Sequence, residues 1–176
     1  MKPTPQANWG VARLALGILA LDQLTKLIVL RYLGVEDQRI VIDGFFKFVH
    51  WRNTGAAFSM WTGNNGLLAV FAVVALLALI LTRHHFGIHT RGGRACLGLI
   101  LGGIAGNLVD RVLPSRQHVI DFLYFYLKRR DGSEAGFPAF NVADSAICIG
   151  VGLLFVLSWR GWPAPSTPAP AAPPPR

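Results

Sequence analysis

Two aspartates, Asp121 and Asp144, have the residue type and the setting for chemistry in this 176-residue sequence. Each borders a long apolar stretch, and neither has an obvious cation beside it in the chain. A pair of carboxylates can hydrolyse a peptide bond: one takes a proton from water, while the other, protonated, hydrogen-bonds the carbonyl and then serves the leaving amine. Close carboxylates favour this division because two like charges cannot both ionise cheaply. On spacing alone, the same residues also fit helix capping, and Asn141 is a good N-cap residue.

Asp22 and Lys26 are charged residues inside the first apolar segment. They are four positions apart, so on a helix they share a face and can form an ion pair. Ionisable side chains are costly in a membrane and are usually paired or functional. We therefore expect this pair either to fix helix packing or to take part in a site.

A polar stripe is predicted along the third apolar segment, because four residues recur there at helical spacing. Its members are Gly103, Asn107, Asp110 and Arg111. Gly103 and the glycines around it let another backbone come close, so the stripe should face protein rather than lipid. Asp110 and Arg111 can offset each other's charge, or each can pair with a residue on another helix.

The composition indicates an all-α integral membrane protein that presents these residues on transmembrane helices. Hydrophobic residues make up 52% of the chain, charged residues 15%, and the mean hydropathy is +0.43. So many apolar runs would leave aggregating patches on a small soluble domain. Four segments approach the 17–25 residues that a membrane-spanning helix needs. They lie near residues 11–32, 66–82, 95–113 and 141–159, and the second, being short, can begin near Phe58.

Between the first two helices, Asp43-Gly44 joins two stretches of alternating apolar character, which predicts a β-hairpin. Its aromatic residues suit a small extracytoplasmic sheet at the membrane surface. Residues 1–162 are expected to form one membrane-embedded domain. The Pro- and Ala-rich stretch 163–176 cannot bury a core, so we expect a disordered cytoplasmic tail.

The distribution of basic residues predicts the topology. The short loop after the second helix carries Arg83, Arg91 and Arg94, and loops rich in Lys and Arg stay in the cytoplasm. This places both termini in the cytoplasm, and the hairpin and residues 117–138 outside. Asp121 and Asp144 then share the outer side of the membrane.

Several other classes of protein fit the sequence poorly. The net charge is +8, but the basic residues are scattered, which favours contacts with membrane lipids over nucleic acid. Cys96 and Cys148 lie in apolar stretches without the spacing of a metal site. We expect both to be small core residues.

Two alternatives use the same acids differently. A proton-coupled transporter would use a relay of Asp22, Asp110 and Asp144, but the acids gather toward one face and the second helix has none. A serine protease would use Ser145, His118 and Asp121, but adjacent helical residues diverge by about 100° and no oxyanion hole is marked. A non-enzymatic scaffold is the third option.

The sequence resembles the lipoprotein signal peptidases (signal peptidase II) over most of its apolar portion, from about Leu14 to Leu157. The matching motifs are Asp22-Gln23-x-x-Lys26, Asn53-Thr54-Gly55-Ala56-Ala57-Phe58-Ser59, Gly102-Gly103-x-x-Gly106-Asn107-x-x-Asp110-Arg111, Val119-Ile120-Asp121-Phe122 and Phe140-Asn141-x-Ala143-Asp144-Ser145. The resemblance implies a membrane aspartic endopeptidase that removes the signal peptide from a bacterial prolipoprotein, cutting before a diacylglyceryl-modified cysteine. It also implies a location in the bacterial cytoplasmic (inner) membrane, with the active site near the periplasmic face. No metal or other cofactor is expected from the resemblance, and globomycin-type cyclic peptides are expected inhibitors.

The resemblance assigns roles to individual residues. Asp121 and Asp144 correspond to the catalytic pair of the family. The substrate-binding positions correspond to Asn53, Asn107, Arg111 and Asn141, and the supporting positions to Asp22, Lys26, Gly103 and Asp110. The stretch 128–138 is longer and more charged than the family pattern, and the Pro-rich tail is peculiar to this chain.

Overall fold

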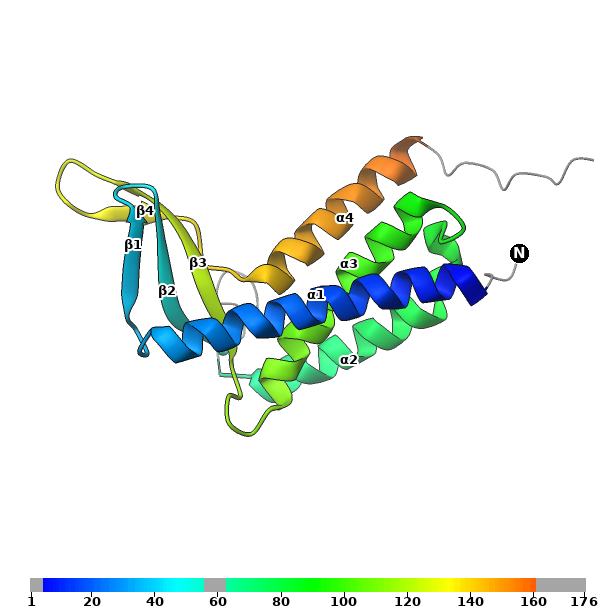
Figure 1. The fold of residues 1–176 in the computed structure, drawn as a ribbon, viewed down its shortest axis with the longest axis horizontal. Helices are drawn as coiled ribbons and strands as arrows, with labels where there is room; N and C mark the ends of the chain where they lie inside the picture. The colour runs from blue at the N-terminus through cyan, green and yellow to red at the C-terminus, as the bar shows by residue number, and fades with distance from the viewer. Residues whose placement is uncertain (1–4, 56–62, 161–176) are drawn as a thin grey trace, which may run out of the picture.

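The computed structural model describes residues 5–55 and 63–160, which form a helical bundle with a small sheet at one end (Figure 1). The four helices are α1 (Pro5–Tyr32), α2 (Asn65–Leu81), α3 (Arg91–Val112) and α4 (Val142–Arg160), and a short 3-10 helix, η2 (Arg83–Phe86), follows α2. Helix α3 is central and packs against the other three, whereas α1 and α2 make few direct contacts. The predicted start of the second helix near Phe58 and the predicted tail at 163–176 lie outside the described residues.

The helices occupy the predicted segments but differ at their ends. Helix α1 begins at Pro5 rather than residue 11, since proline is well tolerated in a first helical turn. Helix α3 begins at Arg91 rather than residue 95, because Thr90 caps it by accepting a hydrogen bond from the Gly93 N–H. Apolar length alone could not reveal these polar helix ends.

Close packing around α3 depends on glycine. A methyl group at Gly102 would lie 2.7 Å from the carbonyl oxygen of Ala15 on α1, and one at Gly103 would lie 2.4 Å from the carbonyl oxygen of Ala143 on α4. Both contacts involve backbone, which cannot move aside cheaply. The expectation that this face of the helix meets protein is therefore confirmed at Gly103.

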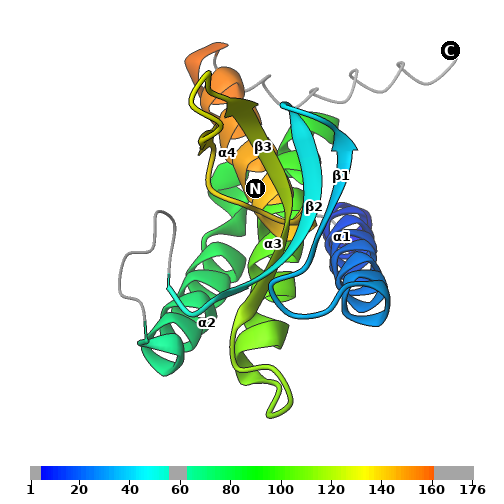
Figure 2. The ribbon, with the colours of Figure 1, turned by 90° about the vertical axis from the view of Figure 1, so that its left-hand side faces the viewer.

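The sheet has four antiparallel strands in the order β1-β2-β3-β4, and Figure 2 shows the first three side by side. They are β1 (Gln38–Ile42), β2 (Phe46–Asn53), β3 (Val119–Lys128) and β4 (Glu134–Gly136). The predicted hairpin is confirmed as β1 and β2, with Gly44 at φ +76° in the turn. The predicted fold was incomplete, because it placed the sheet only between the first two helices, whereas β3 and β4 lie between α3 and α4 and complete the sheet.

The first half of β3 is buried on both faces. Ile120 and Phe122 form an apolar cluster with Val29 of α1, so the sheet is fastened to the ends of the helices. Because this half-strand faces the protein on both sides, it lacks the alternation that marks a half-exposed strand.

Within the described residues, α3 and α4 are long and apolar enough to cross a membrane, and α2 is a shorter apolar helix.

Candidate active site

Asp121 lies on β3 and is almost fully buried, with 4% of its surface exposed. Strand pairing places it opposite Trp51 on β2. The Asn53 side chain donates to Asp121 Oδ2 at 2.9 Å, and the Asn141 side chain donates to Asp121 Oδ1 at 2.9 Å. Thus Asn53 of the sheet holds one carboxylate oxygen of Asp121, and Asn141 at the start of α4 holds the other.

Asp144 lies in the first turn of α4 and takes part in a reciprocal cap. The Asp144 N–H donates to Asn141 Oδ1 at 2.9 Å, and the Asn141 N–H donates to Asp144 Oδ2 at 3.1 Å. Such an exchange satisfies two backbone donors at the end of a helix. The Asn107 side chain of α3 donates to Asp144 Oδ1 at 2.7 Å.

Asn141 links the two carboxylates, since one amide group contacts Asp121 and also caps the turn that carries Asp144. Its side chain is fully buried, and its amide nitrogen also lies 3.2 Å from Asn107 Oδ1. The structure therefore brings the two predicted acids together around one asparagine, from segments 20 residues or more apart in the chain.

The surroundings of Asp121 favour its neutral form. Burial raises the pKa of the Asp121 carboxyl to about 7, and the negative charge of Asp144 acts in the same direction. Hydrogen bonds from Asn53 and Asn141 and the positive charge of Lys26 oppose this rise in pKa without cancelling it. Asp121 can therefore carry a proton near neutral pH.

Lys26, Asp22 and Asp110 form a buried ionic cluster that contacts the residues around the two carboxylates. Lys26 Nζ is 2.9 Å from Asp22 Oδ2 and 2.6 Å from Asp110 Oδ2, and it donates to Asn107 Oδ1 at 3.0 Å. Asp22 also accepts the backbone N–H of Ala143 at 3.0 Å. The predicted pair of Asp22 and Lys26 is confirmed, and it supports both Asn107 and the start of α4.

Asp110 and Arg111 do not neutralise each other. Asp110 pairs with Lys26 and with Arg116, and Gln23 accepts from Arg116 at 2.9 Å. The alternative of partners on other elements is therefore correct. Sequence reasoning gave no role to Gln23 or Arg116; the position of Gln23 beside Asp22 was the available signal, whereas Arg116 lies in a loop without a pattern.

Arg111 holds the chain that precedes α2. It donates to Asn65 Oδ1 at 3.0 Å and to the Gly55 carbonyl oxygen at 2.7 Å. The Gly55 N–H in turn donates to Asn53 Oδ1 at 2.9 Å. Arg111 thus positions the turn that presents Asn53 to Asp121, and Asn65 is a further member of the site that the sequence analysis missed.

The two alternative mechanisms lack support in this geometry. The Ser145 hydroxyl donates to the Asn141 carbonyl oxygen at 2.9 Å, so it is directed into its own helix. Asp22 and Asp110 are bound in ion pairs with Lys26. Within the described part of the chain, no group of three or more His, Cys, Asp or Glu side chains is placed to hold a metal ion.

The fold matches solved structures of membrane enzymes. Two structures described as bacterial membrane enzymes, solved by the in meso method at 2.3 and 1.9 Å resolution, share 28% and 29% sequence identity with the chain. Their TM-scores are 0.71 and 0.66, over 85% and 83% of this chain and 87% and 90% of theirs. This fold places the protein in the class of bacterial membrane enzymes.

Sequence comparison narrows the class. A family model for signal peptidase (SPase) II matches residues 14–160. The lipoprotein signal peptidase of Geobacter sulfurreducens is 42% identical over 89% of this chain and 93% of its own, and that of Bacillus subtilis is 34% identical over 81% and 88%. The chain belongs to the signal peptidase II family, and the resemblance stated from the motifs is confirmed.

Proposed function

We propose that this protein is an aspartic endopeptidase that removes the signal peptide from diacylglyceryl-modified prolipoproteins, with Asp121 and Asp144 as the catalytic pair. Membership of the signal peptidase II family supports a peptidase that acts on prolipoproteins. The observation that carries the choice of residues is the single Asn141 side chain that holds Asp121 and caps the turn of Asp144.

The proposed reaction uses a water molecule placed between the two carboxyl groups. The ionised carboxylate takes a proton from the water molecule while the water oxygen attacks the carbonyl carbon of the peptide bond. The protonated carboxyl donates a hydrogen bond to the carbonyl oxygen. A proton then passes to the leaving amine as the C–N bond breaks. This needs two acids that share one proton, which is how close carboxylates behave.

We assign the base to Asp144 and the acid to Asp121. Asp144 accepts hydrogen bonds from the Asn107 side chain and the Asn141 backbone at the start of α4, where the helix dipole favours a negative charge. Asp121, with a pKa near 7, holds the proton. Because the acids are coupled, the measured pKa values belong to the pair.

Asn53, Asn107, Arg111 and Asn141 are proposed to shape the site for the substrate backbone. In the free protein, Asn53, Asn107 and Asn141 donate to the two aspartates, and Arg111 fixes the turn at Gly55. The ionic cluster of Lys26, Asp22 and Asp110 holds Asn107 in place, and Gly103 allows α4 to approach α3 closely. Asp110 and Gly103 act through position and do not contact the reacting atoms in this proposal.

We further propose that all four helices cross the bacterial inner membrane, with both termini in the cytoplasm and the site near the periplasmic face. All nine acidic residues lie on the side of the proposed site: none occurs in 1–21, 44–109 or 145–176, so acidic side chains are absent from the opposite helix ends. Arg83, Arg91 and Arg94 lie on that opposite side, as cytoplasmic loops require.

A site at the membrane surface suits a lipid-anchored substrate. A scissile bond held near the lipid headgroups reaches the aspartates without unpaired backbone groups entering the bilayer core, where each costs several kcal/mol. Globomycin-type cyclic peptides are proposed as competing ligands of the same site. No metal or cofactor is part of the proposed reaction.

The test compares two substrates that differ only in the lipid. The purified protein is incubated with a diacylglyceryl-modified prolipoprotein and with its unlipidated form, and products are identified by mass spectrometry. We expect cleavage before the lipidated cysteine in the first and little or none in the second. Equal cleavage of both, or of neither, would contradict the proposed function.

A further inference from the structure

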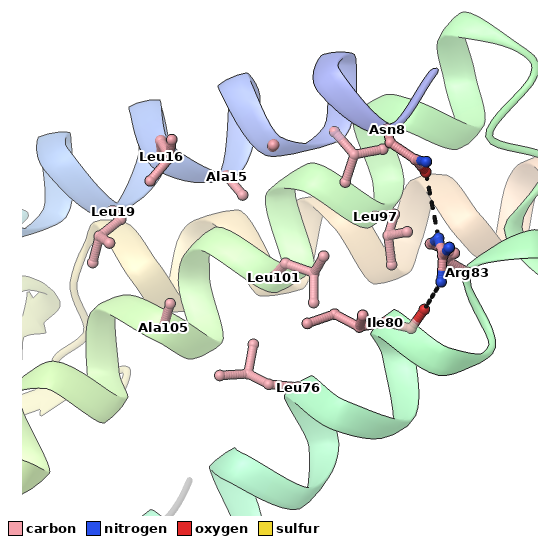
Figure 3. A pocket seen from close by; sticks show the side chains of 12 residues that line it. Asn8, Ala15, Leu16, Leu19, Leu76, Ile80, Arg83, Leu97, Leu101 and Ala105 are labelled. Atoms are coloured by element: carbon pink, nitrogen blue, oxygen red, sulfur yellow. Dashed lines mark hydrogen bonds between the residues drawn. The ribbon is translucent and has the colours of Figure 1, made fainter. Parts of the chain in front are cut away.

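A groove of about 500 Å³ lies between α1 and α2 on the half of the bundle opposite the aspartates, with α3 as its floor (Figure 3). Leu16 and Leu19 of α1, Leu76 of α2 and Leu101 of α3 line it. The groove exists because α1 and α2 each pack on α3 and make few contacts with one another. It is open at the side, toward the lipid in the proposed topology.

The groove has the length of one lipid leaflet. Along α1 it extends from Asn8 to Leu19, which at about 1.5 Å per residue is roughly 16 Å. The hydrocarbon core of a bilayer is about 30 Å thick, so the groove spans about half of it. One end of the groove is at Ala105, beside Gly106, and the other is at the level of Arg83.

The end of the groove at Arg83 is polar and cationic. Arg83 donates to Asn8 Oδ1 at 3.3 Å and to the Ile80 carbonyl oxygen at 2.8 Å, so both partners are neutral (Figure 3). None of the salt bridges between described residues involves Arg83. Trp9 on α1 is 68% exposed at a similar level, as tryptophans at a membrane interface are.

The charges nearby favour an anion. Arg13, Arg91 and Arg94 lie on the same half of the molecule as Arg83, and the sequence has no acidic side chain in the segments that form this half. Basic pockets between membrane helices on the cytoplasmic side bind anionic lipid headgroups. An apolar channel of one leaflet's length that ends at a guanidinium group fits an acyl chain attached to a phosphate.

We propose that this groove binds an anionic phospholipid of the leaflet opposite the aspartates, with one acyl chain along α3 and the headgroup phosphate at Arg83. The site is separate from the proposed active site. It does not depend on the assignment of Asp121 and Asp144.

Binding to lipids of defined headgroup tests this proposal. Purified full-length protein in detergent is titrated with phosphatidylglycerol and with phosphatidylcholine of the same acyl chains, and bound lipid is counted by native mass spectrometry. We expect the wild type to prefer phosphatidylglycerol. Arg83→Gln should weaken phosphatidylglycerol binding about fivefold, the contribution of one cationic side chain near the surface, while Arg129→Gln, at an exposed arginine far from the groove, should not.

A second pair of variants tests where the acyl chain lies. Leu76→Trp fills the groove and should weaken binding of both lipids, whereas Leu77→Trp, at a neighbouring residue that is 54% exposed and does not line the groove, should not. Equal affinity for both lipids, or equal behaviour of Arg83→Gln and Arg129→Gln, would overturn the proposal. So would a lipid-free dimer that Leu76→Trp, but not Leu77→Trp, dissociates, because a second copy would then occupy the groove.

Discussion

At the scale of single residues, Asn141 determines the relation between the two candidate catalytic acids. It is fully buried, donates to Asp121 and accepts the N–H of Asp144. Replacing it removes a donor from one acid and a helix cap from the segment of the other. An asparagine that only capped α4 would need no contact with β3.

We predict that Asn141→Ala lowers the free energy of unfolding by about 1–3 kcal/mol, because it leaves buried partners unsatisfied. Cleavage should fall by at least about a hundredfold, because neither acid is then held in place. Thermal unfolding and single-turnover cleavage measure the two effects.

Asn64→Ala is the matched control for this variant. Asn64 precedes α2, as Asn141 precedes α4, but its side chain makes no capping hydrogen bond. We expect nearly unchanged stability and cleavage. An Asn141→Ala protein as active as Asn64→Ala would contradict the bridging role.

The pKa of Asp121 predicts a pH dependence. As pH rises through about 7, Asp121 loses the proton that the mechanism needs, so cleavage should decline. In the unfolded chain the pKa is about 3.9, so the protonated carboxyl favours the folded state fully below about pH 4, and this stability is lost as pH rises to about 7. Relative to Asp121→Asn, the wild type should therefore become less thermostable over that range.

Asn53→Ala provides an internal check on this pH dependence. The hydrogen bond from Asn53 lowers the pKa of Asp121, so its removal should move the alkaline decline of the remaining activity to higher pH. A pH-rate profile without a decline up to about pH 9 would be inconsistent with Asp121 as the acid.

Sequence patterns could predict residues that sit at helical spacing in apolar segments. Asp22 and Lys26 were expected to pair from their spacing, and they do. Asn65 and Arg116 were missed, because each lies at or beyond a helix end and gains its partner only when separate segments meet. Such contacts depend on the tertiary structure and leave no local periodicity.

At the scale of elements, the interface of α3 and α4 sets the position of Asp144. Gly103 of α3 lies directly against the backbone of Ala143, the residue before Asp144. Asn107, one turn further along α3, donates to Asp144. Any widening of this interface would displace both the capped turn and its hydrogen bond.

We predict that Gly103→Ala destabilises the protein and lowers cleavage by about tenfold or more, because the added methyl group meets a backbone oxygen at 2.4 Å. Gly17→Ala on α1 is the control, since nothing lies within 4 Å of the position of its added methyl group. At that position alanine should be neutral or slightly stabilising. Thermal unfolding and cleavage assays of both variants would show the difference, and equal effects would argue against the tight interface.

Strand β3 was the largest gap in the predicted fold. The hairpin β1–β2 was predictable from Asp43-Gly44 between alternating stretches. In β3, residues 119–122 are all buried, so the apolar pattern has no alternation, and its pairing partner β2 lies about 70 residues earlier in the chain. Local sequence patterns do not carry such long-range pairing.

At the scale of the whole molecule, the acidic residues are confined to the end that carries the sheet. Every acidic residue lies in 22–43 or 110–144, and both candidate catalytic aspartates are among them. The opposite end, with Arg83, Arg91 and Arg94, has basic but no acidic side chains, whereas the sheet end has both. Composition and charge predicted a membrane protein whose acidic residues gather toward one face. The arrangement of its helices around α3 came only from the structure.

We predict that the sheet end faces the periplasm. In spheroplasts, Arg129→Cys at the exposed β3–β4 turn should react with a membrane-impermeant maleimide, while Arg91→Cys, at the exposed first residue of α3, should react only after the membrane is permeabilised. The wild type controls for Cys96 and Cys148, which lie in α3 and α4. The reverse labelling pattern would contradict the proposed orientation.

The most direct test of the account is single-turnover cleavage of a lipidated prolipoprotein by Asp121→Asn and Asp144→Asn. Asparagine keeps the size of each side chain but cannot exchange the proton, so each variant should fold, bind the substrate and lose activity by at least about 10²–10⁴-fold. Asp131→Asn, at an exposed aspartate that bonds only within its own turn, should cleave as the wild type does. Cleavage within about tenfold of wild type by either Asp121→Asn or Asp144→Asn would contradict the proposed catalytic pair.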